Sequence, residues 1–498
     1  MTAGMTLSDV LWLLGATLAI TLVGHRLAGH VSDRRGFFQG NQSLPWWAVS
    51  SSIIATVISS VTFVSVPAYV FKPGGDLGYF QILLGLMLGK VLTALLFARP
   101  FYESTGIQTT YDYIGGRTHP AIGQLSMGLG LLLAIINAAL KVLTASLVLN
   151  VVTGWTLSGC VLGITAFAAL WSALSGVKTV IWTDLLLFVI FTGGAVMAIF
   201  WTADTVTMSI ADAVAELDAR AKLTLFDFSV DPAVSYTLWA GLIGASLLSL
   251  AMAANQGTYQ RVRACRSVAD ARRAYLYSAI FYLTPLCMLV VGLLISVFYV
   301  EHPLPADVLE SLSSEPDRIF PYFIVTEIPH GLATLLIAAI FAAGISTLDT
   351  SLTEVADVTV NNLYARYLRP RASEREYVLA GRLSLVFWSV LFAATALFFS
   401  RFSAEGLLDL TFKLPNYLNG AMLATVLLAR FAIGGVWSYL AGFAAAAMTV
   451  AWLAANGVGF FWWCPASALT MIATVWALHR GRPEWRGIYH ARPLQEEA

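Results

Sequence analysis

The chain has 498 residues, of which 58% are apolar and only 12% are charged, and its mean hydropathy is +0.74. This composition excludes an ordinary soluble globule, because too little charge is available to cover a surface exposed to water. The formal net charge is zero, so the overall charge gives no sign of a nucleic-acid partner. Apolar stretches recur from Leu7 to His479 without a long polar interval, which predicts a single membrane domain over residues 1–498.

The apolar stretches have the length of membrane-spanning helices. A helix that crosses the hydrocarbon core needs about 20 apolar residues, and that length predicts about thirteen spans in this chain. They begin near Leu7, Pro45, Gly78, Ile122, Thr156, Val180, Val234, Tyr275, Val325, Tyr377, Glu405, Gly435 and Gly459. The first stretch lacks the basic start and small-residue cleavage site of a signal peptide, so we expect a retained span. The predicted fold class is all-α and polytopic.

Basic residues predict the orientation in the membrane, because Lys and Arg accumulate in short cytoplasmic loops. They gather after the first, third, seventh and ninth spans and in the tail: Arg26, Arg34, Arg35, Arg117, Arg261, Arg263, Arg266, Arg272, Arg273, Arg366, Arg369, Arg371, Arg375, Arg480, Arg482, Arg486 and Arg492. The opposite loops, 204–231 and 301–317, are acidic or mixed. We therefore expect a multi-pass protein of the inner (plasma) membrane, with the N-terminus outside and the C-terminus in the cytoplasm.

Two spans carry signs of a broken helix. The second, 50–71, is rich in Ser and Thr and contains Pro67, and the seventh, 238–261, ends in the polar cluster 255–258. Non-helical backbone inside a membrane is tolerated only where it lines a cavity within the protein. The two spans lie five helices apart, as in an inverted repeat whose discontinuous helices surround a site near the midplane. The alternative is that the hydroxyls only bond back to helix carbonyls or allow close packing.

The ninth span presents an oxygen-rich face. Its polar residues are Ser346, Thr347, Asp349, Thr350 and Ser351. Several stack at a spacing of four, and hard cations such as Na⁺ prefer such oxygen ligands. A carboxylate like Asp349, or Asp184 in the sixth span, costs ~2.5 to 3.5 kcal/mol at the bilayer centre, so an interior partner is expected. A coupling cation is the simplest partner, and an ion pair with an intramembrane base is the alternative. The available bases are Lys90, Lys141 and Lys413.

Other chemistry has little support in the sequence. The four cysteines, Cys160, Cys265, Cys287 and Cys464, have no metal-ligand spacing. No cluster of His, Glu or Cys indicates a membrane-embedded enzyme, so we expect no enzymatic activity. A sensor with a fused signalling module is also not expected, because the tail after His479 is short.

Several motifs resemble one family over nearly the whole chain. They are Phe38-Gln-Gly-Asn-Gln-Ser-Leu-Pro-Trp-Trp47, Ile58-Ser-Ser-Val-Thr-Phe-Val-Ser-Val-Pro67, Ser175-Gly176 before Val180-Ile-Trp-Thr-Asp184, Asn255-Gln256 before Gln260-Arg261, and Ser346-Thr-Leu-Asp-Thr350. In this order they resemble the sodium/solute symporter family, which includes sodium-coupled sugar, sialic acid, proline, iodide and pantothenate carriers. The resemblance implies a core of two inverted five-helix repeats, over 44–203 and 234–431, with peripheral segments 1–43 and 432–498.

The resemblance also implies ion sites, with sodium as the coupling ion rather than a chemical cofactor. The first site consists of the backbone carbonyls of Ala55 and Ile58 with Ala343, Ser346 and Thr347. A second site, present in some members, matches Asp184, Ser346, Asp349 and Thr350. Those members carry a hydroxyl at the position of Asp349, so the extra carboxylate either strengthens a cation site or holds a proton. The number of sodium ions stays open.

The solute is expected beside the sodium ion. The candidate residues are Thr62, Phe63, Gln81, Asn255 and Tyr259, with Lys413 or Lys90 as a counter-charge. Asn255-Gln256 resembles the sugar-carrying branch, but span eleven, 411–416, lacks the Gln-Glu expected of a galactose carrier. A sugar, a sialic acid and another carboxylate all remain open. The resemblance thus implies alternating-access symport of sodium and a small polar organic solute into the cell, with a proton-coupled symporter on the same scaffold as the alternative.

Overall fold

The structure is a computed structural model that describes residues 40–479 apart from 105, 175 and 402–405, together with residues 15, 19, 20, 22–24, 26, 27 and 38. All regular elements in this part of the chain are helices, which confirms the all-α prediction. Most of the predicted first span from Leu7, and the basic tail after His479, lie outside the described residues.

The longer helices and their halves are α3 (Trp46–Val57), α4 (Ser60–Phe71), α5 (Tyr79–Leu96), α8 (Pro120–Thr153), α9 (Leu157–Leu174), α10 (Val177–Thr205), α12 (Ser246–Ala251), α13 (Gln256–Ala264), α14 (Val268–Ile280), α15 (Leu283–Glu301), α18 (His330–Val358), α19 (Glu374–Phe399), α20 (Leu407–Phe431), α21 (Val436–Ala455) and α22 (Trp463–Leu478). The short connecting helices are α6 (Ala98–Tyr102), α7 (Thr110–Arg117), α11 (Ile210–Ala219), α16 (Ala306–Ser314) and α17 (Ile319–Thr326). Single turns and π-helical segments are η1 (Gly40–Gln42), η2 (Ala240–Ala245), η3 (Met252–Ala254), η4 (Pro316–Arg318), η5 (Thr359–Leu368) and η6 (Phe460–Trp462).

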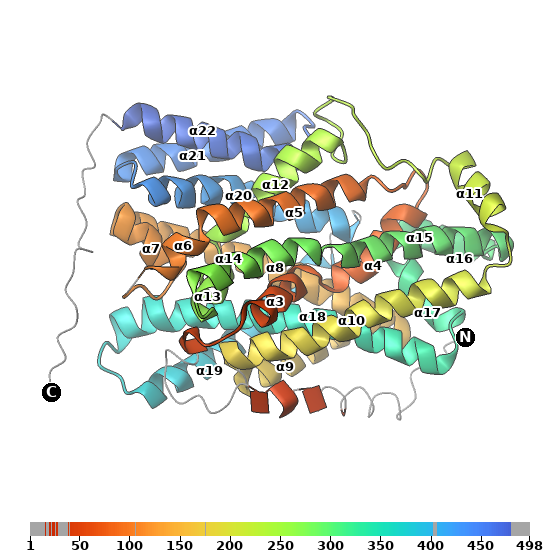
Figure 1. Cartoon of the computed structure of the whole chain (residues 1–498), viewed down its shortest axis with the longest axis horizontal. Coiled ribbons are helices and arrows are strands. Elements are labelled where there is room, and N and C mark those ends of the chain that lie inside the picture. Colours follow the sequence, from red (N-terminus) through yellow and green to blue (C-terminus); the bar gives the residue numbers. More distant parts are fainter. Residues whose placement is uncertain are drawn as a thin grey trace.

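The helices form a bundle suited to a membrane. Among the described residues, 8 helices are long and apolar enough to cross a bilayer, and the bent pair α3 and α4 makes up to 9. Two shorter apolar helices, Leu157–Ala173 and Ala240–Ala254, add to these. The chain is therefore a multi-pass membrane protein, and the number thirteen stays a prediction. The helices run side by side along the long axis of the molecule, with α21 and α22 on one flank and α9 and α19 on the other (Figure 1).

The second predicted span is broken, as expected. α3 and α4 are bent by 54° across a break at Ile58 and Ser59, both of which have extended backbone. The Ser59 hydroxyl accepts a hydrogen bond from the backbone N–H of Val61 at 3.3 Å and so caps α4. Pro67 lies inside α4, nearly two turns beyond the break. The end of α3 leaves backbone carbonyls without helical donors, and these are potential cation ligands.

The seventh predicted span is also interrupted where its polar cluster lies. It runs through η2, α12 and η3, becomes extended at Asn255 (φ −86°, ψ 147°), and resumes as α13. The Thr258 hydroxyl donates to the Met252 carbonyl at 2.7 Å across this break. Both predicted breaks are therefore confirmed.

Helix α5 and the π-helical segment η2 pack so closely that their backbones are in direct contact. A Cβ on Gly85 of α5 would lie 1.9 Å from the carbonyl oxygen of Gly241 in η2. A Cβ on Gly241 would lie 2.2 Å from the carbonyl oxygen of Gln81. Only glycine permits this approach, because any side chain would collide with the opposite backbone.

A buried lysine fixes the loop after α11 to the broken span. The Lys222 ammonium group donates to four backbone carbonyls at the C-terminal end of α4: those of Val70 at 2.6 Å, Phe71 at 3.2 Å, Lys72 at 3.3 Å and Gly75 at 3.3 Å. A cation at a helix C-terminus is favourable because it satisfies carbonyls that lack helical donors. The loop is thereby held against α4.

This lysine predicts a pH dependence of stability. Burial, together with the nearby Arg220, lowers the pKa of Lys222 from its ordinary 10.5 to about 8. Between these values the unfolded chain binds more protons than the folded protein, so the contribution of Lys222 to the free energy of unfolding rises with pH. Below pH 8 the cost of burying its charge is fully present. Thermal unfolding in detergent should therefore show the wild type gaining stability relative to Lys222→Met as pH rises above 8. A difference between the two proteins that does not change with pH would contradict this assignment, and Lys178→Met serves as the control.

Candidate ion and solute site

A buried carboxylate joins three helices near the first break. The Ser52 hydroxyl of α3 donates to Asp184 Oδ2 at 2.5 Å, and the Ser346 hydroxyl of α18 donates to Asp184 Oδ1 at 2.5 Å. Asp184 belongs to α10, and all three side chains are buried. The structure thus brings together Asp184 and Ser346, two of the residues predicted for the second sodium site, and adds Ser52.

The residues predicted for the first sodium site meet where α18 packs on the broken span. Ala55, Ile58 and Ala343 belong to one buried cluster. The Thr347 hydroxyl donates to the Ala343 carbonyl at 2.8 Å, and the Ser346 hydroxyl points to Asp184. Carbonyls at the end of α3 and hydroxyls of α18 are neutral oxygens of the kind that a hard monovalent cation prefers.

Asp349 and Thr350 have different surroundings. Trp171 Nε1 of α9 donates to Asp349 Oδ2 at 3.2 Å, and Asp349 Oδ1 is buried without a hydrogen-bond partner in the described part of the chain. Thr350 Oγ1 lies 3.4 Å from Thr56 Oγ1 and 3.1 Å from the guanidinium of Arg261. Asp349 thus contacts α9, whereas Thr350 belongs to the interface with α3 and α13.

Arg261 has a position that differs from the expectation. The sequence groups it with the basic residues that follow the seventh span, but it lies inside α13 with a side chain only 7% exposed. Its Nη2 atom is 3.9 Å from Asp184 Oδ2, and Nη1 is 3.4 Å from Glu354 Oε1. A buried guanidinium needs such acceptors, and this pairing explains why it does not extend to the surface. The Gln260-Arg261 motif was the only sign of this role in the sequence.

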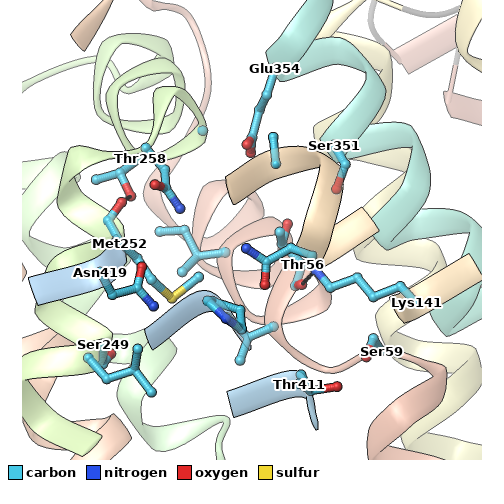
Figure 2. Close-up of a pocket in the computed structure, with 18 of the residues that line it drawn as sticks. Thr56, Ser59, Lys141, Ser249, Met252, Thr258, Ser351, Glu354, Thr411 and Asn419 are labelled. Atoms are coloured by element: carbon cyan, nitrogen blue, oxygen red, sulfur yellow. Dashed lines mark hydrogen bonds between the residues drawn. The ribbon is translucent and has the colours of Figure 1, made fainter. Parts of the chain in front are cut away.

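A cavity of about 190 Å³ lies beside these residues, between the two helix breaks. Figure 2 shows Thr56 and Ser59 of the first break, Thr258 of the second, Ser351 and Glu354 of α18, and Lys141 of α8 around it. Among its described lining residues, the charged ones are Lys90, Lys141, Arg261 and Glu354. The Lys141 ammonium donates to the Thr56 carbonyl at 3.4 Å, at the last turn of α3.

Only some of the residues predicted to contact the solute line the cavity. Thr62 and Asn255 line the cavity, and so does Lys90. The four others, Phe63, Gln81, Tyr259 and Lys413, are not among the lining residues. Phe63 packs on Phe191, the Gln81 amide bonds to the backbone of Asp227 and Tyr236, and the Tyr259 hydroxyl bonds to Ser104 and the Ile107 carbonyl. The cavity is also lined by Thr56, Ser249, Glu354 and Asn419, for which the sequence predicts no solute role.

A second polar cluster links α13 to α18 and to the start of α7. Asp357 Oδ2 of α18 accepts from the amides of Gln256 and Gln260, each at 2.6 Å. The Gln256 Oε1 atom accepts from the backbone N–H of Thr110 at 2.8 Å. Asn255 and Gln256 of the motif therefore line the cavity, and Gln256 also fixes the position of α13.

Two interrupted helices around a cavity deep in a helical bundle are typical of secondary transporters. The family model described as "Sodium:solute symporter family" matches residues 37–437. This match covers most of the chain, so the chain belongs to the sodium:solute symporter family, as the motifs predicted. The family consists of transporters and not of enzymes.

Individual relatives are distant in sequence. The chain is 28% identical over 404 residues to the human sodium/iodide cotransporter, covering 79% of this chain and 61% of the relative. It is 26% identical to the bovine sodium-coupled monocarboxylate transporter 2, with coverages of 78% and 62%. It is 25% identical to the sodium/sialic acid symporter SiaT of Proteus mirabilis, with 84% of both chains covered. The chain thus spans about three fifths of the first two relatives and most of the third.

The fold is shared with solved transporters. A sodium-coupled sialic acid symporter, solved with substrate in an outward-open state, superposes with a TM-score of 0.82 at 22% identity, covering 94% of this chain and 96% of that one. A nucleobase-cation-symport-1 family transporter gives a TM-score of 0.54 at 14% identity, with coverages of 90% and 95%. These likenesses confirm the predicted fold with discontinuous helices.

Proposed function

We propose that the protein is a sodium-coupled symporter that carries a small organic carboxylate across the membrane. The observation that carries the solute class is the charge of the cavity, which two basic side chains, Lys90 and Lys141, line in addition to Arg261, whose own charge is paired with Asp184 and Glu354. An excess of positive charge in a cavity of low dielectric favours an anion. The relatives described above, a sodium/iodide cotransporter, a monocarboxylate transporter and a sialic acid symporter, agree with an anionic solute.

The sodium ion is proposed to bind between the broken span and α18. Its ligands are the carbonyls of Ala55, Ile58 and Ala343 with the hydroxyls of Ser346 and Thr347. Asp184, Ser346 and Thr350 are proposed for a second cation, with the Asp184 carboxylate already linked to Ser346. Asp349, the fourth residue predicted for this site, bonds to Trp171 of α9 instead. Bound sodium would hold α3, α4 and α18 together, and the solute would contact Thr62, Asn255 and Lys141 in the adjoining cavity.

This arrangement supports alternating access. The helix breaks at Ile58 and Asn255 both line the cavity, and each permits a change of angle between its two halves. Sodium and solute would bind on one side of the membrane and leave on the other after the halves tilt. Each sodium ion that moves inward through 100 mV gains ~2.3 kcal/mol, which drives solute accumulation.

The orientation proposed from the sequence agrees with the grouping of basic loops. Arg266 donates to the Ser43 carbonyl, and the Tyr102 hydroxyl donates to the Arg266 carbonyl, so three loops meet at one end of the bundle. The acidic loop after α10 lies at the other end, where Glu301 accepts from Thr207. We propose that the basic end faces the cytoplasm, with the repeats over 44–203 and 234–431 forming the core.

Uptake into liposomes tests the proposal. The purified protein is reconstituted with an imposed sodium gradient or a matched potassium gradient, and labelled monocarboxylate, sialic acid, iodide and glucose are compared. We expect a carboxylate to accumulate in sodium and not in potassium. Accumulation of glucose alone, or equal uptake in both cations, would refute the proposal.

Proton coupling is the second candidate. The observation that favours it is Asp349 Oδ1, a buried carboxylate oxygen without a hydrogen-bond partner among the described residues. A buried carboxyl group that lacks a counter-charge favours its neutral form. Uptake that follows a pH gradient in sodium-free liposomes, and that Asp349→Asn removes, would support it against the sodium reading.

Lys141 provides a specific prediction about the solute. Replacement by Gln should weaken carboxylate binding about tenfold, the effect of losing ~1.4 kcal/mol of attraction, while uptake stays dependent on sodium. The measurement is the solute concentration at half-maximal uptake. Lys413→Gln is the matched control, because Lys413 does not line the cavity. Equal affinities in the wild type and Lys141→Gln, or a loss only in Lys413→Gln, would assign the counter-charge elsewhere.

A further inference from the structure

A buried arginine contacts the oxygen atoms of the candidate cation site. The side chain of Arg261 is 7% exposed, and a charge with so little access to water requires acceptors within the protein. Its acceptors are Ser52 Oγ at 3.3 Å from Nε, Gly257 O at 3.2 Å and Glu354 Oε1 at 3.4 Å from Nη1, and Thr56 Oγ1 at 2.5 Å and Thr350 Oγ1 at 3.1 Å from Nη2. These acceptors come from α3, α13 and α18.

The guanidinium shares its surroundings with Asp184. Nη2 lies 3.9 Å from Asp184 Oδ2, and the Ser52 hydroxyl that receives Nε also donates to this carboxylate oxygen at 2.5 Å. A cation that coordinated Asp184 and Thr350 would lie within a few ångströms of the guanidinium. Two positive charges at that distance repel each other strongly inside a protein, so the two cations cannot both be stable there.

Glu354 already accepts from Nη1 of the guanidinium at 3.4 Å, so it can hold the side chain when Nη2 moves away from Asp184. The Glu354 carboxylate is 18% exposed, lines the cavity, and belongs to α18 about one turn beyond Thr350. It lies against α13 because residue 257 is glycine: a Cβ there would be 1.7 Å from Glu354 Oε1. Arginine remains charged at all physiological pH values and bonds to two acceptors at once, so it can move between two carboxylates without losing its proton.

We propose that Arg261 and the second sodium ion, the one assigned to Asp184 and Thr350, are alternative cations for Asp184. When sodium binds, the guanidinium is displaced toward Glu354. When sodium leaves, the guanidinium returns, neutralises Asp184 and so promotes release of the ion. The inference rests on the proposed sodium coupling and adds to it a residue that sets the sodium affinity from within the protein.

Sodium titration of thermal stability in detergent tests this role, with choline replacing sodium at constant ionic strength. Arg261→Gln removes the competing charge and keeps hydrogen-bonding capacity. We expect the sodium concentration at half-maximal stabilisation to fall about tenfold or more, because a like charge has been removed from the site. Glu354→Gln weakens the alternative position of the guanidinium and should raise that concentration. In liposomes, Arg261→Gln should lose most net uptake, because sodium leaves slowly.

Arg263→Gln is the matched control. Arg263 lies two residues away on the same helix, is also buried, and donates to the Tyr102 carbonyl at 2.6 Å, away from Asp184. Its sodium titration should match the wild type. An unchanged or higher half-maximal concentration in Arg261→Gln would overturn the inference. If Arg261→Gln fails to fold, Glu354→Gln decides, and a lower or unchanged value there would refute the competition. A wild type that is not stabilised by sodium at all would instead refute the proposed function, and this inference with it.

Discussion

Replacing Ser346 and Thr347 together by alanine is expected to abolish sodium-stimulated uptake while the protein remains folded. Ser346 is the α18 hydroxyl that bonds to Asp184, and Thr347 lies beside it on the face that meets the broken span. We take the free-energy contribution of each oxygen ligand to be similar to that of a hydrogen bond to a charged group, about 1.5–3 kcal/mol. Losing two ligands then raises the sodium concentration needed for uptake about a hundredfold or more. Initial uptake rates over a series of sodium concentrations measure this shift.

The control for this pair lies on the same helix. Thr334→Ala removes a hydroxyl near the start of α18 that donates to the His330 carbonyl at 3.0 Å, far along the helix from Asp184. Its sodium dependence should equal that of the wild type. Normal uptake in the double variant, with an unfolding temperature close to that of the wild type, would remove these residues from the sodium site.

The second large effect is expected at the contact between α5 and η2. Gly85→Ala places a methyl group 1.9 Å from the carbonyl oxygen of Gly241, and neither backbone is free to move aside within the packed bundle. Overpacking of this kind costs about 3 kcal/mol or more. We expect a markedly lower unfolding temperature in detergent and a reduced yield of monodisperse protein.

Gly128→Ala is the matched control for Gly85→Ala. Gly128 lies within α8, and a Cβ there would meet no atom within 4 Å. Alanine in place of glycine in a helix interior is favourable by about 0.5–1 kcal/mol, so stability should stay the same or increase. If Gly85→Ala were as stable as Gly128→Ala, the two backbones would not be in the close contact that the structure shows.

The sequence predicts the helix breaks well because their causes are local. Ser59 caps α4 through its own hydroxyl, and Asn255 starts a polar cluster within an apolar span, so both interruptions are written into neighbouring residues. The site residues Thr62 and Asn255 follow directly, since they lie next to those breaks and line the cavity. The ion ligands were predicted from the family resemblance, because local sequence patterns alone do not identify them.

Other side chains could not be placed because distant segments decide their direction. Gln81 lies on a helix near the cavity, but its amide bonds to backbone groups at 227 and 236, about 150 residues later in the chain. Arg261 reads as one of several basic residues at a span end, and only the approach of α10 and α18 supplies the carboxylates that keep it buried. Hydrophobic periodicity contains no information about such partners.

The break at Asn255 also divides one continuous stretch of sequence into two segments that pack against different helices. On its far side, α13 is tied to α18 through Asp357, and to the segment before α7 through the Tyr259 hydroxyl. On its near side, α12 and η2 pack against α5. A rotation at Asn255 would leave all of these side-chain bonds intact. α13 therefore travels with the inner part of α18 and not with its own span, so distance labels on 250 and 262 should report the conformational cycle more sensitively than labels on 262 and 358.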